Sequence, residues 1–432
     1  MRILFYISIA VLLFGCSQKQ TVVLNEEHLQ FKCIEDLNEV IVYDIYSPPV
    51  ASRIYAYCNL AYYETIIYSS KSMKSITASL KDFSRIDMSL KNNGDVDFNF
   101  AATVAFFTIA KTLCFSKDSV ALKLKYYEDY FENKLTKQEY TSSVEFGKNI
   151  AAVILKRAAS DNYKTIKGLP KYTVVKQNNS WEQTPPDYAD AIEPNWFLLQ
   201  PMLIDSTNMS CALPPMYNEA KESKYYKEVM EVFEISKART LAMDSTAKYW
   251  DDNPFVTEHK GHFTAATKKI TPGGHWLGIA SIICKQKKVG VLSSAKAIAL
   301  TSCAIYDGFI ACWHMKYKTK MPRPITIIRK LINPNWNAYL QTPPFPEYTS
   351  GHSVISSAAA SVLTNILGNN ISFVDSTEYK YLGLIKSFPS IDSAANQAGV
   401  SRIYGGIHYR SAVENGKQHG KKIGELYNEI FK

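Results

Sequence analysis

The sequence predicts an all-α protein built from ten or more helices. Nearly every long segment of the 432-residue chain repeats its apolar residues with a period near 3.6, which is typical of helices buried on one face. Strand-like runs are short, and hydrophobic residues make up 46% of the chain, enough for a large core. Beyond the N-terminus no segment reaches 18 uninterrupted apolar residues, so we expect a globular bundle rather than membrane-spanning helices.

The start of the chain predicts a bacterial lipoprotein. Arg2 precedes an apolar run, residues 3–14, which has the length of a signal-peptide core and is too short to cross a bilayer. The tetrapeptide LFGC resembles a bacterial lipobox, so Cys16 is expected to carry a lipid and to begin the mature chain. We therefore expect a signal peptide over 1–15, a tether over 16–30, and attachment to a membrane of the bacterial cell envelope only through this lipid. The alternative is an ordinary secretion signal with a cysteine there by chance.

The rest of the chain divides into two helical parts. Residues 31–215 form the N-terminal part, in which residues 161–215 lack helical periodicity, are rich in proline turns and are expected to wrap over the surface. Residues 216–432 form a C-terminal bundle that we expect to carry the functional site. Helices are expected over residues 53–68, 98–115, 121–135, 142–160, 224–236 and 295–317, and from about residue 350.

The charge pattern argues against nucleic acid as a partner. The formal net charge is +9, but the 49 Lys and Arg residues are dispersed and matched by 40 acidic residues. A modest affinity for small anions is the inference that remains. The seven cysteines after Cys16 form no CxxC pair, so the sequence predicts no cysteine metal site.

Three segments of the C-terminal part carry unusual residues, and the first supplies two cations. Trp313 and Lys316 lie one turn apart near the end of an expected helix. Two prolines then stop that helix and hold Arg323 in an extended turn. Alone, these cations are most simply interpreted as solvated surface charges.

The second segment, EYTSGHSVISSAAASVL, begins the helix expected near residue 350. Ser350 is suited to cap it, but Gly351 and His352 both disfavour helix formation. A glycine lets a backbone N–H approach a ligand closely, and the N-terminus of a helix attracts negative charge. The segment therefore indicates an anion with a proton donor or acceptor beside it.

In the third segment, a helix carrying Arg402 breaks at two glycines and delivers His408 to the start of the next helix. A lone histidine there is more often a structural, hydrogen-bonded residue. Together, however, the three segments supply three cations, neutral donors and two imidazoles. This set is suited to a tetrahedral or trigonal-bipyramidal oxyanion, with one imidazole on the central atom and the other moving a proton.

The three motifs together resemble the signature of vanadium-dependent haloperoxidases and type 2 phosphatidic acid phosphatases. They are Lys-x6-Arg-Pro at 316–324, Ser-Gly-His at 350–352 and Arg-x5-His at 402–408. The similarity extends to YWDDNP and TPGGHW within 249–276, which are features of the soluble bacterial haloperoxidase branch. The resemblance implies a large helical bundle of the vanadium haloperoxidase and acid phosphatase type.

The haloperoxidase branch implies a vanadate cofactor whose vanadium is bound by His408. His352 would be the acid–base residue that helps hydrogen peroxide to bind, and a halide, iodide or bromide, would be oxidised to hypohalous acid. The residues that would hold the vanadate oxygens are Lys316, Arg323, Ser350, Gly351 and Arg402.

The same resemblance implies three supporting residues. Trp313 and Phe345 match aromatic positions that line the halide side, although packing in the core explains them equally well. Asp252 resembles an acid that pairs with Arg402 behind the site, and Asp251 is equally available in the sequence.

The phosphatase branch implies other chemistry at the same residues, with a phosphate ester as substrate and no vanadate. His408 would attack phosphorus and His352 would protonate the leaving group. Such phosphatases usually carry an Asp four residues after the nucleophile, where this chain has Ala412, and the lipid phosphatases are built from membrane-spanning helices. The sequence therefore favours a haloperoxidase. A periplasmic acid phosphatase and a helical lipoprotein that binds a ligand without catalysis are the alternatives.

Overall fold

The computed structural model describes residues 24–84, 95–175, 177–254, 256–260 and 262–431. The expected signal peptide and Cys16 lie outside these residues. Of the expected tether, residues 26–30 already form the helix η1 (Glu26–His28) and the start of α1 (Leu29–Tyr43). The helical core of the protein therefore begins earlier than the sequence predicted.

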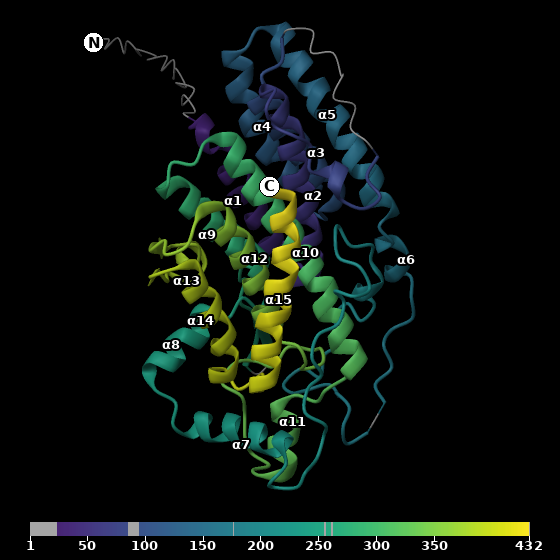
Figure 1. Cartoon of the computed structure of the whole chain (residues 1–432), viewed down its shortest axis with the longest axis vertical. Helices are drawn as coiled ribbons and strands as arrows, with labels where there is room; N and C mark the ends of the chain where they lie inside the picture. Colours follow the sequence, from purple (N-terminus) through teal and green to yellow (C-terminus); the bar gives the residue numbers. More distant parts are fainter. Residues whose placement is uncertain (1–23, 85–94, 176, 255, 261, 432) are drawn as a thin grey trace, which may run out of the picture.

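Helices dominate the described residues, and the predicted all-α class is confirmed (Figure 1). Every helix expected from periodicity is present, with its ends shifted by a few residues. The remaining helices are α2 (Pro48–Ile66), η2 (Ile67–Ser69), η3 (Thr77–Ser79), α3 (Phe98–Leu113), α4 (Lys117–Lys134), α5 (Lys137–Ser160), α6 (Tyr163–Lys167), η4 (Trp196–Leu198), α7 (Lys224–Lys237), α8 (Leu241–Tyr249), α9 (Pro272–Gln286), α10 (Val291–Thr319), α11 (Pro324–Leu331), α12 (Gly351–Leu367), α13 (Tyr379–Leu382), α14 (Ile391–Tyr404) and α15 (Arg410–Phe431).

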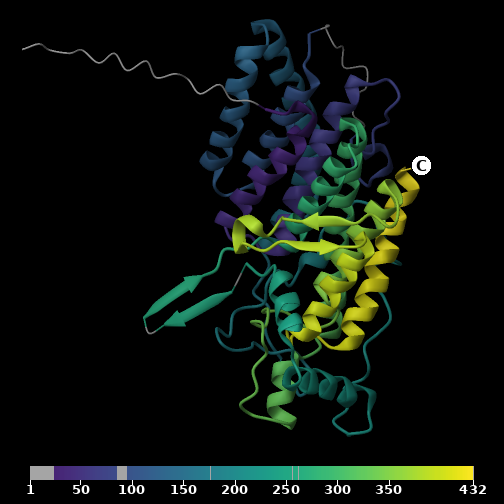
Figure 2. The ribbon, with the colours of Figure 1, turned by 90° about the vertical axis from the view of Figure 1, so that its left-hand side faces the viewer.

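Two antiparallel hairpins interrupt this helical pattern, and the sequence did not predict them. Figure 2 shows β1 (Thr257–Lys260) and β2 (Phe263–Ala266) as an arm beside the bundle. The second hairpin, β3 (Phe373–Asp375) with β4 (Lys386–Phe388), crosses the C-terminal helices in Figure 2, and α13 lies in the connection between its strands. Strands of three or four residues are too short to give a clear alternating pattern.

The long helix α10 connects the two halves of the bundle. It packs against α2 in the N-terminal half and against α12 in the C-terminal half (Figure 1). Within the described residues, the segment Val291–Leu331 is long and apolar enough to cross a membrane, but 94% of its most apolar window is buried inside the bundle. A helix that is apolar on all sides is expected at the centre of a large protein.

The helices α12 and α15 approach each other closely, and this contact sets the geometry of the site. Gly416, Gly420 and Gly424 repeat every four residues on the face of α15 that meets α12. A Cβ atom at Gly420 would overlap the carbonyl group of Val354, and one at Gly424 would meet the carbonyl oxygen of Ala358. This glycine row therefore holds the N-terminus of α12 beside the turn that precedes α15.

The loop-rich segment 161–215 contains little helix, as expected, but it does not simply cover the surface. The carboxylate of Asp307 in α10 accepts backbone N–H bonds from three successive residues, Met202, Leu203 and Ile204, at 2.7–3.1 Å. The side chains of Trp181 and Trp196 are completely buried. The segment is thus anchored in the core by one buried acid and several apolar side chains.

Candidate active site

The three sequence motifs meet at one cavity in the C-terminal half. The cavity lies where the N-terminus of α12, the end of α14 and the turn before α15 face the side of α10. Its wall includes Asp252, Trp313, Phe345, Gly351, His352, Arg402 and His408. Lys316, Arg323 and Ser350 are fully buried directly behind this wall. All of the residues predicted from the sequence to form the site are therefore gathered in one place.

Lys316 fastens the loop that leads into α12. Its ammonium group is fully buried and donates to the carbonyl oxygens of Pro346, Glu347 and Thr349 at 3.0, 3.1 and 2.5 Å. Burial lowers its pKa to about 7, and the nearby Arg323 acts in the same direction. Lys316 thus places a positive charge behind the cavity and uses its three N–H donors to hold the loop.

Arg323 sits at the N-terminal end of α11 and reaches His408. Its Nε donates to the carbonyl oxygen of Phe345 at 2.9 Å, and its Nη1 donates to that of Ile407 at 2.8 Å and lies 3.1 Å from Nε2 of His408. Its Nη2 is buried without a hydrogen-bond partner among the described residues. Burial lowers the pKa of the guanidinium to about 10. An unpaired buried donor of this kind is costly unless an acceptor binds there.

Arg402 supplies the third buried cation, from the last turn of α14. Its Nη2 donates to the carbonyl oxygens of Trp250 and Ala247, and its Nε donates to Ser401. Burial lowers its pKa, while the charges of Asp251 and Asp252 oppose this effect. The described contacts include no ion pair between Arg402 and Asp252. The pairing implied by the family resemblance is therefore replaced by bonds to backbone carbonyls.

The N-terminus of α12 opens into the cavity. The hydroxyl of Ser350 caps the helix by accepting the backbone N–H of Ser353 at 3.3 Å. At Gly351, the next residue, an added Cβ would meet no atom within 4 Å. The positive end of a 17-residue helix therefore faces free space that a small anion can fill.

His352 follows Gly351 and lies against Asp252. Its Nε2 is 3.5 Å from Oδ2 of Asp252. Burial and the charge of Arg402 lower its pKa, and Asp252 acts in the opposite direction. The imidazole is consequently neutral near pH 7 and able to accept a proton, with a carboxylate beside it to stabilise the charged form.

His408 lies at the centre of the site and is held by two partners. Its Nδ1 is 2.8 Å from Oε1 of Glu347, and its Nε2 faces Nη1 of Arg323. Burial, together with the charges of Arg323, Lys316 and Arg402, lowers its pKa well below the usual value. These partners assign the Nδ1–H tautomer, because Glu347 accepts a proton bond and Arg323 can only donate one. Nε2 therefore carries the ring's lone pair, and in this structure that lone pair accepts a hydrogen bond from Nη1 of Arg323.

Sequence reasoning missed Glu347 and a second buried cluster around His275. His275 in α9 lies with Nδ1 3.1 Å from Oδ1 of Asp252 and Nε2 2.8 Å from Oδ2 of Asp375. These two carboxylates raise its pKa well above the usual value despite burial. Glu378 lies 3.5 Å from the same Nδ1. The cluster connects the wall of the cavity to the β3–β4 hairpin. In the sequence, Asp252 and the histidine of TPGGHW were noted separately, and nothing indicated that they meet.

Trp313 and Phe345 form the apolar side of the cavity. Their ring centroids are 5.0 Å apart, and Nε1 of Trp313 donates to the carbonyl oxygen of Ile192 at 3.1 Å. The Lys316 and Arg323 cations each lie 5.0 Å from the centroid of the Phe345 ring. The aromatic pair thus packs in the core and also lines the cavity.

The residues present fit a small, multiply charged oxyanion. Three cations are buried around one cavity, and burial lowers the pKa of each, so a bound anion would stabilise their charged forms. The unpaired Nη2 of Arg323 and the free space at Gly351 both provide room for oxygen acceptors. Nε2 of His408 carries the lone pair that would bind a central atom, in place of the hydrogen bond that it accepts from Nη1 of Arg323 at 3.1 Å. Vanadate and phosphate both meet these requirements.

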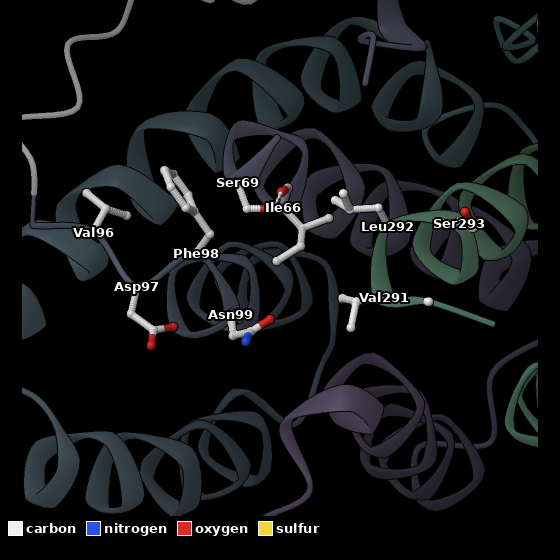
Figure 3. Close-up of a pocket in the computed structure, with 10 residues that line it drawn as sticks. Ile66, Ser69, Val96, Asp97, Phe98, Asn99, Val291, Leu292 and Ser293 are labelled. Carbon is white, nitrogen blue, oxygen red and sulfur yellow. Dashed lines mark hydrogen bonds between the residues drawn. The ribbon is translucent and has the colours of Figure 1, made fainter. Parts of the chain in front are cut away.

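A larger cavity in the N-terminal half of the bundle does not have the residues that an oxyanion site needs. Figure 3 shows its lining between the end of α2 and the starts of α3 and α10. Its one carboxylate, Asp97, already caps α3 by accepting the backbone N–H of Phe100 at 2.9 Å. Among its described lining residues there is no histidine, lysine or arginine. The small cavity with the three motifs is therefore the candidate site.

Comparison with known proteins identifies the family. The family model described as the VCPO second helical-bundle domain matches residues 296–432, which contain all three motifs. The crystal structure of the first bacterial vanadium-dependent iodoperoxidase is similar over 95% of this chain and 98% of that chain, with 36% sequence identity and a TM-score of 0.89. No curated protein matches the sequence. The chain therefore belongs to the vanadium-dependent haloperoxidase family.

More distant structures show the same fold. A bacterial vanadium-dependent chloroperoxidase is similar in its holo form, with 18% identity, a TM-score of 0.67 and coverage of 90% of this chain and 93% of that chain. Its apo form gives 16% identity, a TM-score of 0.65 and coverage of 89% and 94%. The prediction of a haloperoxidase fold and enzyme class is confirmed. Lipidation at Cys16 and the cell-envelope location stay predictions.

Proposed function

We propose that this protein uses a vanadate bound to Nε2 of His408 to oxidise iodide with hydrogen peroxide, giving hypoiodous acid. The observation that carries the proposal is the position of His408 in the cavity wall, with Nε2 3.1 Å from Nη1 of Arg323 and three buried cations around it. The choice of iodide is supported by the 36% identity to an iodoperoxidase, and by the fact that iodide is the most easily oxidised of the halides named above.

The roles of the residues follow from their positions. When bound, vanadate supplies a Lewis-acidic centre that activates peroxide without a change in its oxidation state. Arg323, Arg402 and the backbone N–H of Gly351 would hold its oxygens, with Lys316 contributing charge from behind the loop. His352 takes up a proton released by peroxide, and the carboxylate of Asp252 stabilises the resulting imidazolium. Trp313 and Phe345 would keep water away from the halide.

The test is a set of assays on the purified protein. With vanadate, peroxide and iodide it should form triiodide, and added orthophosphate should inhibit by competing for the same cavity. Without vanadate the activity should be lost. Phosphate release from p-nitrophenyl phosphate together with no iodide oxidation would contradict the proposal and favour an acid phosphatase with His408 as nucleophile.

The location of the protein is a further part of the proposal. The apolar run at residues 3–14 and the lipobox-like sequence ending at Cys16 support a lipoprotein of the bacterial cell envelope. The enzyme would then act outside the cytoplasm, on peroxide and halide that reach the envelope.

A further inference from the structure

Glu347 contacts the proposed vanadium ligand directly, and it lies three residues before the Ser-Gly-His motif, in a segment whose glutamate was given no role. Its side chain is completely buried beside the cavity. Oε1 accepts two hydrogen bonds, from Nδ1 of His408 and from the backbone N–H of Tyr409, both at 2.8 Å. The carboxyl group of Glu347 therefore contacts both the imidazole of His408 and the backbone of Tyr409.

The backbone of Glu347 is itself held from two sides. Its N–H donates to the carbonyl oxygen of Met321 at 2.9 Å, and its carbonyl oxygen accepts from Lys316 at 3.1 Å. A buried side chain on a backbone fixed in this way has little freedom to move. A hydrogen bond to a carboxyl group that is fixed in this way can set the orientation of the imidazole ring that donates it.

Within the part of the chain that the structure describes, the other ring nitrogen of His408 contacts no acceptor that would compete for the proton. Nε2 faces Arg323, whose guanidinium is only a donor. Histidines that bind metals usually donate their second N–H to a carboxylate or carbonyl group, which fixes the tautomer and the ring orientation and increases ligand basicity. Glu347 occupies this position relative to His408.

We propose that Glu347 is a positioning residue that holds His408 in the Nδ1–H tautomer with Nε2 directed at vanadate, and that this contact determines the affinity for vanadate. The inference rests on the proposed function. To hold His408 in this way, Glu347 needs only an acceptor oxygen at the position of Oε1, and the side chain of a glutamine also has such an oxygen. Oε1 already receives two N–H donors, so the carbonyl oxygen of a glutamine would be the group placed there.

Vanadate binding by the full chain, dialysed free of vanadate and titrated by calorimetry, tests this proposal. E347A should bind vanadate about 10–100-fold more weakly than the unsubstituted protein, the range found when such supporting partners are removed. E347Q should restore binding to within about threefold, because the acceptor is kept. An E347A affinity within twofold of the unsubstituted protein, or an E347Q affinity as weak as that of E347A, would overturn the proposal.

Glu64 offers a matched control. It is also fully buried, and its Oε1 also accepts two backbone N–H bonds, from Ile76 and Thr77 at 2.9 and 3.0 Å, but it lies in α2 away from the cavity. E64A should lose stability and keep its vanadate affinity. If E64A weakened binding as much as E347A, the effect of Glu347 would be structural only.

A second measurement needs no substitution at Glu347. In protein labelled with 15N-histidine and free of vanadate, the ring signals of His408 should show a protonated Nδ1 and an unprotonated Nε2, with assignment by their loss in H408A. The opposite tautomer would overturn the proposal whether or not E347A folds. Failure of the unsubstituted protein to bind vanadate would instead contradict the proposed function and leave the tautomer result as an independent finding.

Discussion

At the scale of single residues, the site depends on groups whose protonation is set by burial. His352 and His408 have neighbouring positions in the cavity but different partners, Asp252 for the first and Glu347 for the second. The same low-dielectric surroundings lower the pKa of both rings. One imidazole is thereby suited to move a proton and the other to donate a lone pair.

Replacing His352 with alanine should separate proton transfer from cofactor binding. We expect vanadate affinity to stay within about threefold, while kcat for iodide oxidation falls by about 10²–10⁴, the usual contribution of a positioned acid–base group. His314, in α10, lies outside the cavity wall, and H314A serves as the control. Unchanged turnover in H352A would show that another group moves the proton.

The pH dependence should report the pKa of His352. Its neutral form must accept the proton, so activity is lost as the pH falls through its lowered pKa. Asp252 raises that pKa, so D252N should lower it further and move the acid limb of kcat to lower pH. D251N removes a charge that raises the pKa of His352 less than Asp252 does, and should move the limb less. A shift of the D252N limb to higher pH would contradict the assignment.

The motifs predicted the cations and imidazoles of the site, but not the acids that hold them. Ala412 left His408 without an acid partner in its own segment, and Glu347 supplies one from 61 residues earlier. His275 is likewise held by Asp375, which is 100 residues away. Acidic side chains carry no periodic pattern, and only the folded chain determines which of them meet a histidine.

At the scale of elements, helical periodicity predicted the main helices because each buries one face or its whole surface. It did not predict the β1–β2 and β3–β4 hairpins, whose strands have three or four residues. The tether expected after the lipobox-like sequence included residues 26–30, which lie in η1 and α1. The buried anchors of segment 161–215 escaped prediction because isolated tryptophans and a loop-binding Asp307 leave no periodic signal.

The contact between α12 and α15 gives a prediction at this scale. Replacing Gly420 with alanine forces a methyl group against the backbone of Val354 and should separate the two helices. We expect a loss of about 1–3 kcal/mol in the free energy of unfolding, as for other overpacked sites. Vanadate affinity should also fall, because α12 carries Gly351 while His408 directly precedes α15.

Urea denaturation measures the loss of stability in this variant. Gly168 at the end of α6 is a suitable control, since an added Cβ there makes only ordinary contacts and its φ of −87° suits any residue. G168A should unfold at nearly the same urea concentration as the unsubstituted protein. Equal stability of G420A would show that the helices can separate without cost.

At the scale of the whole molecule, the cavity is lined mostly by residues of the C-terminal half, and Pro48 at the start of α2 adds a contact from the N-terminal half. The family model begins at residue 296, inside α10, and covers the three motifs but not Asp252 of the cavity wall. The first 23 residues lie outside the described structure, so their prediction rests on the sequence.

Lipidation can be tested on intact cells. In a bacterial host grown with a radioactive fatty acid, the protein should be labelled and should fractionate with membranes. C16S should lose both properties, because only the thiol of Cys16 can carry the lipid. C33S, which changes a buried cysteine of α1, should keep the label. A labelled C16S protein would show that the lipobox assignment is wrong.

The central claim is that one cavity binds vanadate through His408 among three buried cations. Anomalous diffraction at the vanadium edge, from a crystal grown with vanadate, tests it most directly. We predict a single vanadium peak bonded to Nε2 of His408, with its oxygens within hydrogen-bond distance of Arg323, Arg402 and the N–H of Gly351. A peak at another site, or a cavity without vanadium at saturating vanadate, would contradict the account.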